Sequence, residues 1–182
     1  PLAISANQIT VIGFGFGLAA CWAVANQAYE LALVLLLINR FGDGLDGAVA
    51  RRNGATDLGA YLDIVADFLL WLLLPLAFIV GAPQNAVAAA VLLSSFAMSM
   101  VVFLAFAIMA EKRGVSTESQ GKKSFFYMAG LAEGTETIGF FVFVMVAPAY
   151  FIPAAYGFAA LVYLSVIGRL WTSVIALKET EH

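Results

Sequence analysis

Four of the five aspartates in one 25-residue stretch form two pairs, in a chain that is otherwise strongly apolar. Asp43 and Asp46 are three positions apart, and Asp63 and Asp67 are four apart, so each pair lies on one face of its own helix. Two such helices facing each other would bring four carboxylates to one point. Carboxylate oxygens are the ligands that Mg²⁺, Mn²⁺ and Ca²⁺ prefer, so the spacing predicts a metal site.

The energetic cost of these carboxylates also indicates a function. One carboxylate at the centre of a membrane helix costs roughly 2.5–3.5 kcal/mol on insertion scales. The basic residues nearest in sequence are Arg40, Arg51 and Arg52. Three cations cannot neutralise the four aspartates together with Asp57, whereas one or two divalent metal ions can. A purely structural role, which would suit a single buried acid, is therefore the weaker interpretation.

The composition shows where these helices must lie. Of 182 residues, 63% are hydrophobic and 12% are charged, and the mean hydropathy is +0.94. A soluble domain cannot bury that much apolar surface, so the chain is expected to be an all-α integral membrane protein. No basic face suited to nucleic acid is present, and the single cysteine, Cys21, cannot form an intrachain disulfide.

The spacing of charges and turn residues predicts six transmembrane helices in a single domain, residues 1–182. The turn between the third and fourth helices is placed at residues 81–85. The predicted helices cover residues 8–26, 29–51, 57–80, 85–111, 122–147 and 153–177.

The basic residues predict the orientation of these helices. The segments 27–28, 81–84 and 148–152 contain none of the nine Lys and Arg residues, which all fall toward the opposite face. By the positive-inside rule that face is cytoplasmic, and both termini lie there. The aspartates are then expected near the cytoplasmic ends of the second and third helices.

The stretch DGLDGAVARRNGATDLGAYLDIVAD, residues 43–67, resembles the signature of the CDP-alcohol phosphotransferase family. The matching positions are Asp43, Asp46, Gly47, Ala50, Arg51, Gly59, Asp63 and Asp67. One residue fewer separates Arg51 from Gly59 than in the commonest form of the signature. This difference falls in the expected turn, where a change of length is cheap. The resemblance is specific over residues 40–70 and extends elsewhere only to the helix layout.

The resemblance implies an enzyme of phospholipid biosynthesis. The donor would be a CDP-linked lipid, typically CDP-diacylglycerol, and an alcohol would attack its lipid-side phosphorus and release CMP. Two divalent ions, Mg²⁺ or Mn²⁺, would be held by Asp43, Asp46 and Asp63, with Asp67 sharing a metal or standing free. Asp67 matches the position of the family's general base. The resemblance also implies a homodimer.

The small residues of the stretch permit two interpretations. Gly47, Ala50 and Gly59 allow membrane helices to approach closely, or they leave room for the cytidine and its phosphates. Arg51 would contact a donor phosphate or extend to the lipid headgroups. Thr56 would cap the third helix or touch the nucleotide.

The acceptor site is less specified. Relatives that use phosphorylated polyols are expected to carry arginines near GLAE, where this chain reads GLAEGTET. Glycine and threonine in place of those arginines weaken the case for a phosphorylated acceptor but leave it open. Arg113, Lys122, Lys123 and Arg169 could form an anion pocket, or contact lipid headgroups only. Glu133 and Glu136 share a helix face, and three interpretations fit this position. The two residues could recognise a cationic or amino acceptor, hydrogen-bond to the metal ligands from a second layer, or form ion pairs with Lys122 or Arg169.

Two other functions would fit parts of this pattern. A small cation transporter would also carry carboxylates in its helices, but carboxylates clustered near one face of the membrane leave no series of polar residues leading to the opposite face. A catalytically silent assembly protein would tolerate Asp67→Asn.

The compact chain favours a bacterial inner membrane. Trp22, Trp71 and Trp171 are expected to be interfacial or lipid-facing anchors.

Overall fold

The computed structural model describes residues 5–54, 56–112 and 134–179, and these residues are helical with no strand among them. The predicted residues Arg113, Lys122, Lys123 and Glu133 lie outside this part of the chain. The helices are α1 (Ala6–Ala25), α2 (Tyr29–Asn53), α3 (Asp57–Gly81), α4 (Ala86–Lys112), α6 (Gly134–Val146) and α7 (Phe151–Glu179). Two short 3₁₀ turns, Pro83–Asn85 and Pro148–Tyr150, precede α4 and α7.

Four of the helical segments are long and apolar enough to cross a membrane, so the chain is an integral membrane protein. They are Ala6–Ala25, Asp57–Gly81, Pro83–Lys112 and Pro148–Lys178. Helix α2 is equally long but carries many charged residues, and the described part of the predicted fifth helix, α6, is only 13 residues. The all-helical prediction is confirmed, while six membrane crossings and their orientation stay predictions.

The helix ends follow the local chemistry of the sequence. Ser5 and Gln8 form a capping box at the start of α1, and the Thr56 hydroxyl caps α3. The break between α3 and α4 falls in the predicted segment 81–85. The last helix begins at Phe151 and not at residue 153 as predicted, because Pro153 stands in the first turn, where its missing N–H costs no hydrogen bond.

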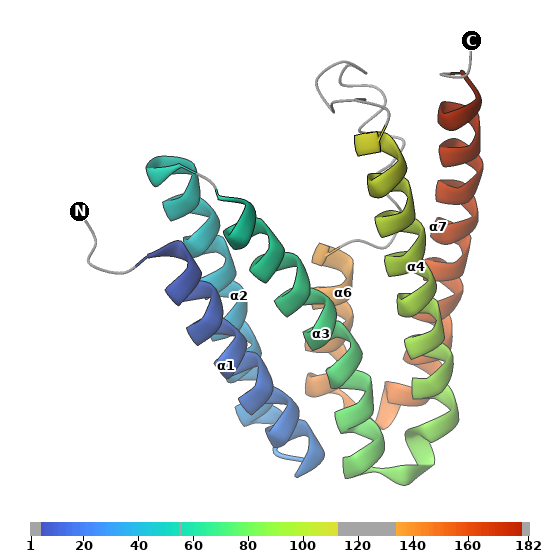
Figure 1. Ribbon diagram of the computed structural model, residues 1–182. Coiled ribbons are helices and arrows are strands. Elements are labelled where there is room, and N and C mark those ends of the chain that lie inside the picture. The colour runs from blue at the N-terminus through green and yellow to red at the C-terminus, as the bar shows by residue number, and fades with distance from the viewer. Residues whose placement is uncertain (1–4, 55, 113–133, 180–182) are drawn as a thin grey trace.

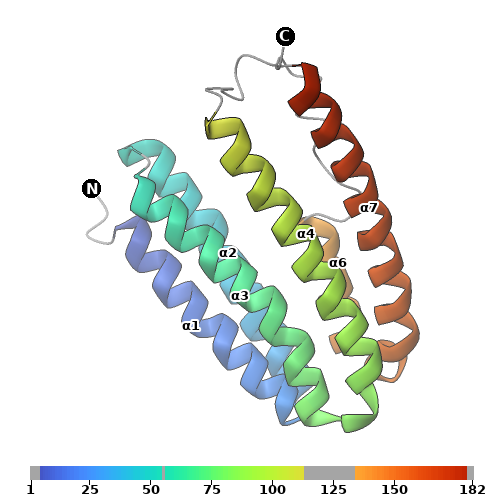
Figure 2. The same ribbon diagram turned by 45° about the vertical axis from the view of Figure 1, so that its right-hand side comes forward.

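The helices form two groups that meet at α3. Helix α1 packs against α2 and α3, α4 packs against α7, and α3 contacts both α1 and α4. Figures 1 and 2 show α1, α2 and α3 side by side, with α6 between them and the α4–α7 pair. The start of α3 and the end of α2 lie at the same end of the bundle as the start of α1 and the end of α7 (Figure 1).

Stacked aromatic rings fill the interior between the two groups. Phe78 of α3 stacks on Phe151 with ring centroids 4.4 Å apart, and Trp71 stacks on Phe141 at 5.8 Å. The prediction that the tryptophans face lipid or the interface is wrong for Trp71, whose exposed fraction is 7%. Trp22 and Trp171 are exposed on the surface of the chain, as predicted.

Glycine allows α3 to approach α1 closely at its carboxyl end. A Cβ on Gly81 would lie 2.8 Å from the backbone oxygen of Val24, too close for any real contact. The Gln27 side chain donates to the Gly81 carbonyl across the same contact, at 2.5 Å. The close approach therefore needs a residue without a side chain at position 81.

Gly81→Ala should destabilise the protein by about 1–3 kcal/mol, because the backbone must move to admit the methyl group. Gly157→Ala is the matched control: it lies within α7 with no atom within 4 Å of an added Cβ. It should instead stabilise α7 by up to about 1 kcal/mol. Thermal unfolding in detergent measures both, and equal effects of the two variants would contradict the packing argument.

Candidate metal and donor site

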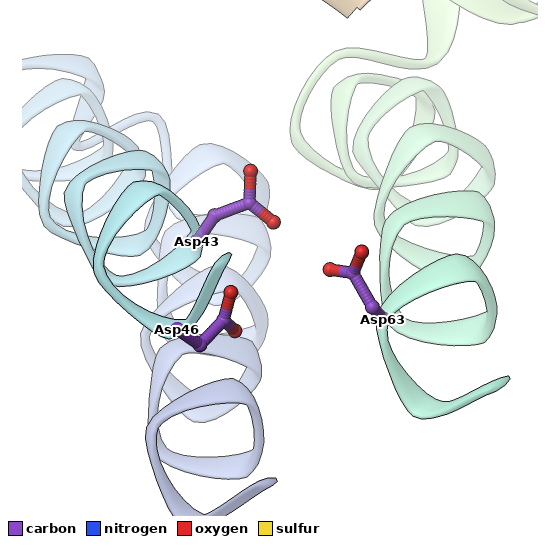
Figure 3. Close-up of side chains that lie close together, drawn as sticks. All are labelled: Asp43, Asp46 and Asp63. Atoms are coloured by element: carbon purple, nitrogen blue, oxygen red, sulfur yellow. The ribbon is translucent and has the colours of Figure 1, made fainter. Parts of the chain in front are cut away.

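Three of the four aspartates come together at the meeting of α2 and α3. Asp43, Asp46 and Asp63 each place one carboxylate oxygen within 4.8 Å of the others. Figure 3 shows Asp43 and Asp46 on α2 pointing toward Asp63 on α3. Oxygens that bind one Mg²⁺ or Ca²⁺ at about 2.0–2.6 Å lie at most about 5 Å apart. The three residues, called here the carboxylate group, therefore fit a divalent cation.

The fourth aspartate, Asp67, has a different partner. Its Oδ1 accepts a hydrogen bond from Arg40 Nη2 at 2.8 Å, and Arg40 Nη1 lies 3.7 Å from Asp43 Oδ2. Both ion pairs formed by these aspartates within the described residues are made by Arg40. Sequence reasoning placed Arg40 near the site without giving it a partner.

A residue that sequence reasoning missed supports Asp46. The Thr10 hydroxyl of α1 donates to Asp46 Oδ2 at 2.5 Å, and Asp46 is buried. The hydrogen bond orients the one carboxylate of the group that is shielded from solvent. The available signal was the polar residues at positions 5, 7, 8 and 10, which open an otherwise apolar first helix.

A cavity of about 360 Å³ adjoins the carboxylate group. Asp46 and Asp63 contribute to its wall, so the space opens directly onto two of the three carboxylates. The start of α1 closes its other side. The lining residues are Ser5, Ala6, Asn7, Thr10, Asp46, Gly47, Val49, Ala50, Gly54, Thr56, Gly59, Ala60 and Asp63.

The predicted donor-binding residues lie around this cavity. Gly47, Ala50, Thr56 and Gly59 line it, and the Arg51 guanidinium lies 3.4 Å from the position of a Cβ on Gly47. Thr56 also caps α3 by accepting from the Gly59 amide at 3.1 Å, so its structural role is present as well. Their contact with a nucleotide stays a prediction.

Gly59 is both a packing and a cavity residue. A Cβ there would lie 3.0 Å from Asn7 Oδ1 and 3.1 Å from Thr56 Oγ1. A side chain at this position would therefore press on α1 and on the cap of α3 at once. The two interpretations of the small residues are not exclusive at this position.

A second cavity, of about 260 Å³, lies on the α4–α7 side of α3. Phe68 and Trp71 of α3 line it together with Arg169, whose Nη1 donates to Ser99 Oγ at 3.3 Å. Of the predicted acceptor residues, Glu136 lies exposed in the first turn of α6, where its neighbours Gly134 and Thr137 line the cavity and Glu136 itself does not. Arg169 is the acceptor candidate that the structure places in a cavity.

Comparison with known proteins shows the family of the chain. The family model for CDP-alcohol phosphatidyltransferases matches residues 3–176, and the chain belongs to that family. It is 43% identical to the inner membrane protein YnjF of Escherichia coli over 180 residues, 98% of this chain and 87% of that protein. No solved structure matches the chain.

Two shorter matches carry more specific names. The chain is 41% identical over 69 residues to an archaetidylinositol phosphate synthase of Pyrococcus horikoshii, covering 37% of each protein. It is 45% identical over 62 residues to a bifunctional IPC transferase and DIPP synthase of Aquifex aeolicus, covering 34% of this chain and 14% of that protein. The family makes the chain a transferase of substituted phosphate groups of the kind used in phospholipid synthesis, and this family uses divalent metal ions.

Asp63→Asn should weaken Mn²⁺ binding at least about tenfold, since even the mutation of a residue that only supports a metal ligand commonly lowers metal affinity by this much. Asp57→Asn is the matched control, because Asp57 lies on the same helix but outside the carboxylate group. Titration of the purified protein followed by electron paramagnetic resonance measures both affinities. Equal losses in the two variants would show that the group does not hold the ion.

Proposed function

We propose that the protein transfers a phosphatidyl group from a CDP-linked lipid, such as CDP-diacylglycerol, to an alcohol and releases CMP in a metal-dependent reaction. The observation that carries this proposal is the cavity of about 360 Å³ with Asp46 and Asp63 in its wall. Such a volume falls in the range of small-molecule sites. This cavity offers space for a nucleotide, and its wall carries ligands for the metal ions that would bind the phosphates of that nucleotide.

The walls of this cavity suit a nucleoside diphosphate group. Gly47, Ala50 and Gly59 keep the space open, and the start of α3 at Thr56 contributes to the lining. The free N–H groups at a helix start favour anionic phosphate. Arg51 stands beside Gly47 and supplies a positive charge for a phosphate oxygen.

The carboxylate group would hold the ions. When bound, divalent ions would neutralise the pyrophosphate and the charge that develops on the departing CMP. Asp46, fixed by Thr10, and Asp63 would anchor them from two different helices. Asp43 completes the group on the side of Arg40.

The acceptor would meet Asp67. On α3, Asp63 lines the donor cavity, whereas Phe68 and Trp71 line the second cavity, and Asp67 lies between them along the helix. The acceptor oxygen would attack the lipid-side phosphorus, and its proton would pass to Asp67. The bond from that phosphorus to the bridging oxygen would break, leaving the electron pair on CMP.

An anionic acceptor is the first class to test. Arg169 lines the second cavity beside Ser99, and a guanidinium suits phosphate or carboxylate. One relative is named as an archaetidylinositol phosphate synthase, but it shares only 37% of its length with this chain. Glu136 is next to Thr137, which lines the same cavity, and its role toward an acceptor stays a prediction.

The proposed setting is a bacterial inner membrane with six spans, both termini in the cytoplasm, and a homodimer. The relative from Escherichia coli is named an inner membrane protein. All basic residues are compatible with one face, and the carboxylate group lies at the end of the bundle where α2 ends and α3 begins. A soluble nucleotide and a lipid could therefore reach the site from the same side.

A cation transporter fits the structure less well. The carboxylates lie at one end of α2 and α3, and farther along these helices Leu36, Leu70 and Leu74 are completely buried. These apolar side chains offer no ligand to an ion. The glycine-lined cavity beside the carboxylates has no use in ion conduction.

The purified protein in detergent should release CMP from CDP-diacylglycerol with Mg²⁺ or Mn²⁺ and one acceptor. The acceptors to compare are glycerol 3-phosphate, inositol, inositol phosphate, serine, ethanolamine, choline and phosphatidylglycerol. Asp67→Asn should lower the rate by at least about 100-fold, the usual contribution of a general base. Absence of both turnover and metal-stabilised CDP-lipid binding would exclude this function.

Gly47→Leu should raise the KM for the CDP-linked donor by at least about tenfold, since the new side chain occupies the space for the nucleotide. Gly44→Leu is the matched control on the same helix, with an exposed position and no atom within 4 Å of an added Cβ. Steady-state CMP release measures both. A normal KM in Gly47→Leu would place the donor elsewhere.

A further inference from the structure

Arg40 is the most constrained charged side chain of the site. Its guanidinium is held on four sides: by Asp67, by Asp43, by Asn39 and by the face of Trp71. The exposed fraction of the side chain is only 12%. Arg40 is not part of the family signature identified in the sequence, so no role in the reaction follows from that resemblance.

The neighbours of Arg40 are themselves held in place. Asn39 Oδ1 accepts from Arg40 Nε at 2.8 Å, while Asn39 Nδ2 donates to the Gly13 carbonyl of α1 at 2.8 Å. The Arg40 Cζ lies 4.8 Å from the centre of the Trp71 ring, a favourable cation–π distance. Contacts with α1, α2 and α3 therefore determine the position of the guanidinium.

This position divides the four aspartates into two sets. Asp43, Asp46 and Asp63 form the carboxylate group, whereas Asp67 is tied to Arg40 through Oδ1 at 2.8 Å. An ion pair through one oxygen restricts the carboxylate plane and directs Oδ2 away from the guanidinium. We propose that Arg40 is a positioning residue that keeps Asp67 out of the metal-binding set and orients it for the acceptor alcohol.

The chemistry of arginine suits this role better than that of lysine. The planar guanidinium presents donors in fixed directions, so Nε, Nη1 and Nη2 can address Asn39, Asp43 and Asp67 together. An ammonium group donates from a single nitrogen, so it does not present donors at the three separated positions that face Asn39, Asp43 and Asp67. The role of Asp67 toward the acceptor rests on the proposed function. The separation of Asp67 from the other three aspartates rests only on the ion pairs of Arg40.

A purely structural ion pair is the competing explanation. Such a pair would hold α2 to α3, and its loss would lower thermal stability without lowering kcat in the variant that remains folded. The positioning role predicts a lower kcat at an unchanged KM for the donor, with part of kcat recovered by Arg40→Lys. The division between kcat and KM therefore separates the two explanations.

Arg40→Gln should bind Mn²⁺ roughly three- to tenfold more tightly than the unchanged protein, because a positive charge beside the site is removed. It should lower kcat at least about tenfold and leave the KM for the donor within about threefold. Arg40→Lys should recover part of kcat. Arg52→Gln removes an exposed charge from the same helix and should change none of these values.

Asp67→Asn tests the same division without removing Arg40. It should leave Mn²⁺ affinity within about threefold of the unchanged protein, in contrast to the loss of at least about tenfold expected for Asp63→Asn. Equal losses in these two variants would overturn the proposal, as would unchanged or weaker Mn²⁺ binding in Arg40→Gln. The Mn²⁺ titrations require no turnover, so failure to release CMP with any acceptor would count against the proposed function alone.

Discussion

The ion pair between Arg40 and Asp67 joins the two helices that carry the aspartates, and Arg40 also pairs with Asp43 of its own helix, so the geometry of the site depends on this one guanidinium. Asp43 and Asp67 both carry negative charge and would repel each other where α2 meets α3. One guanidinium between them replaces this repulsion with two attractions. Because Asn39 and Trp71 hold that guanidinium, the relative position of α2 and α3 is coupled to α1 and to the aromatic interior.

Helix α1 is the third wall of the site, and small residues permit its close approach. Gly13 lies opposite Gly42 of α2, with 3.6 Å between a Cβ on Gly42 and the Gly13 Cα, and a Cβ on Gly17 would meet Leu70 of α3 at 3.0 Å. The approach brings the Thr10 hydroxyl to Asp46 and the Gly13 carbonyl to Asn39. Packing of small residues and orientation of the carboxylates are thus produced by the same helix contacts.

The second group of helices has a different part in the architecture. Helices α4 and α7 pack on each other, and they are connected to the helices of the site by the contact of α4 with α3 and by α6, which contacts both α7 and α2. Trp71 lies between the two groups of helices. Its ring contacts the Arg40 guanidinium and stacks on Phe141, and its side chain also lines the second cavity. An acceptor bound in that cavity would therefore lie beside the residue that supports Arg40 and, through it, Asp67.

The sequence alone was sufficient for the helical class, the break at residues 81–85, and a set of carboxylates whose oxygens suit a divalent metal, because each depends on local periodicity or residue chemistry. It could not show that Trp71 is buried, that Thr10 supports Asp46, or that Arg40 takes Asp67 as its partner. Those facts depend on how helices from separate parts of the chain cross and on the rotamers that crossing allows. The periodicity of a helix determines which residues share a face, but only tertiary packing decides what that face meets.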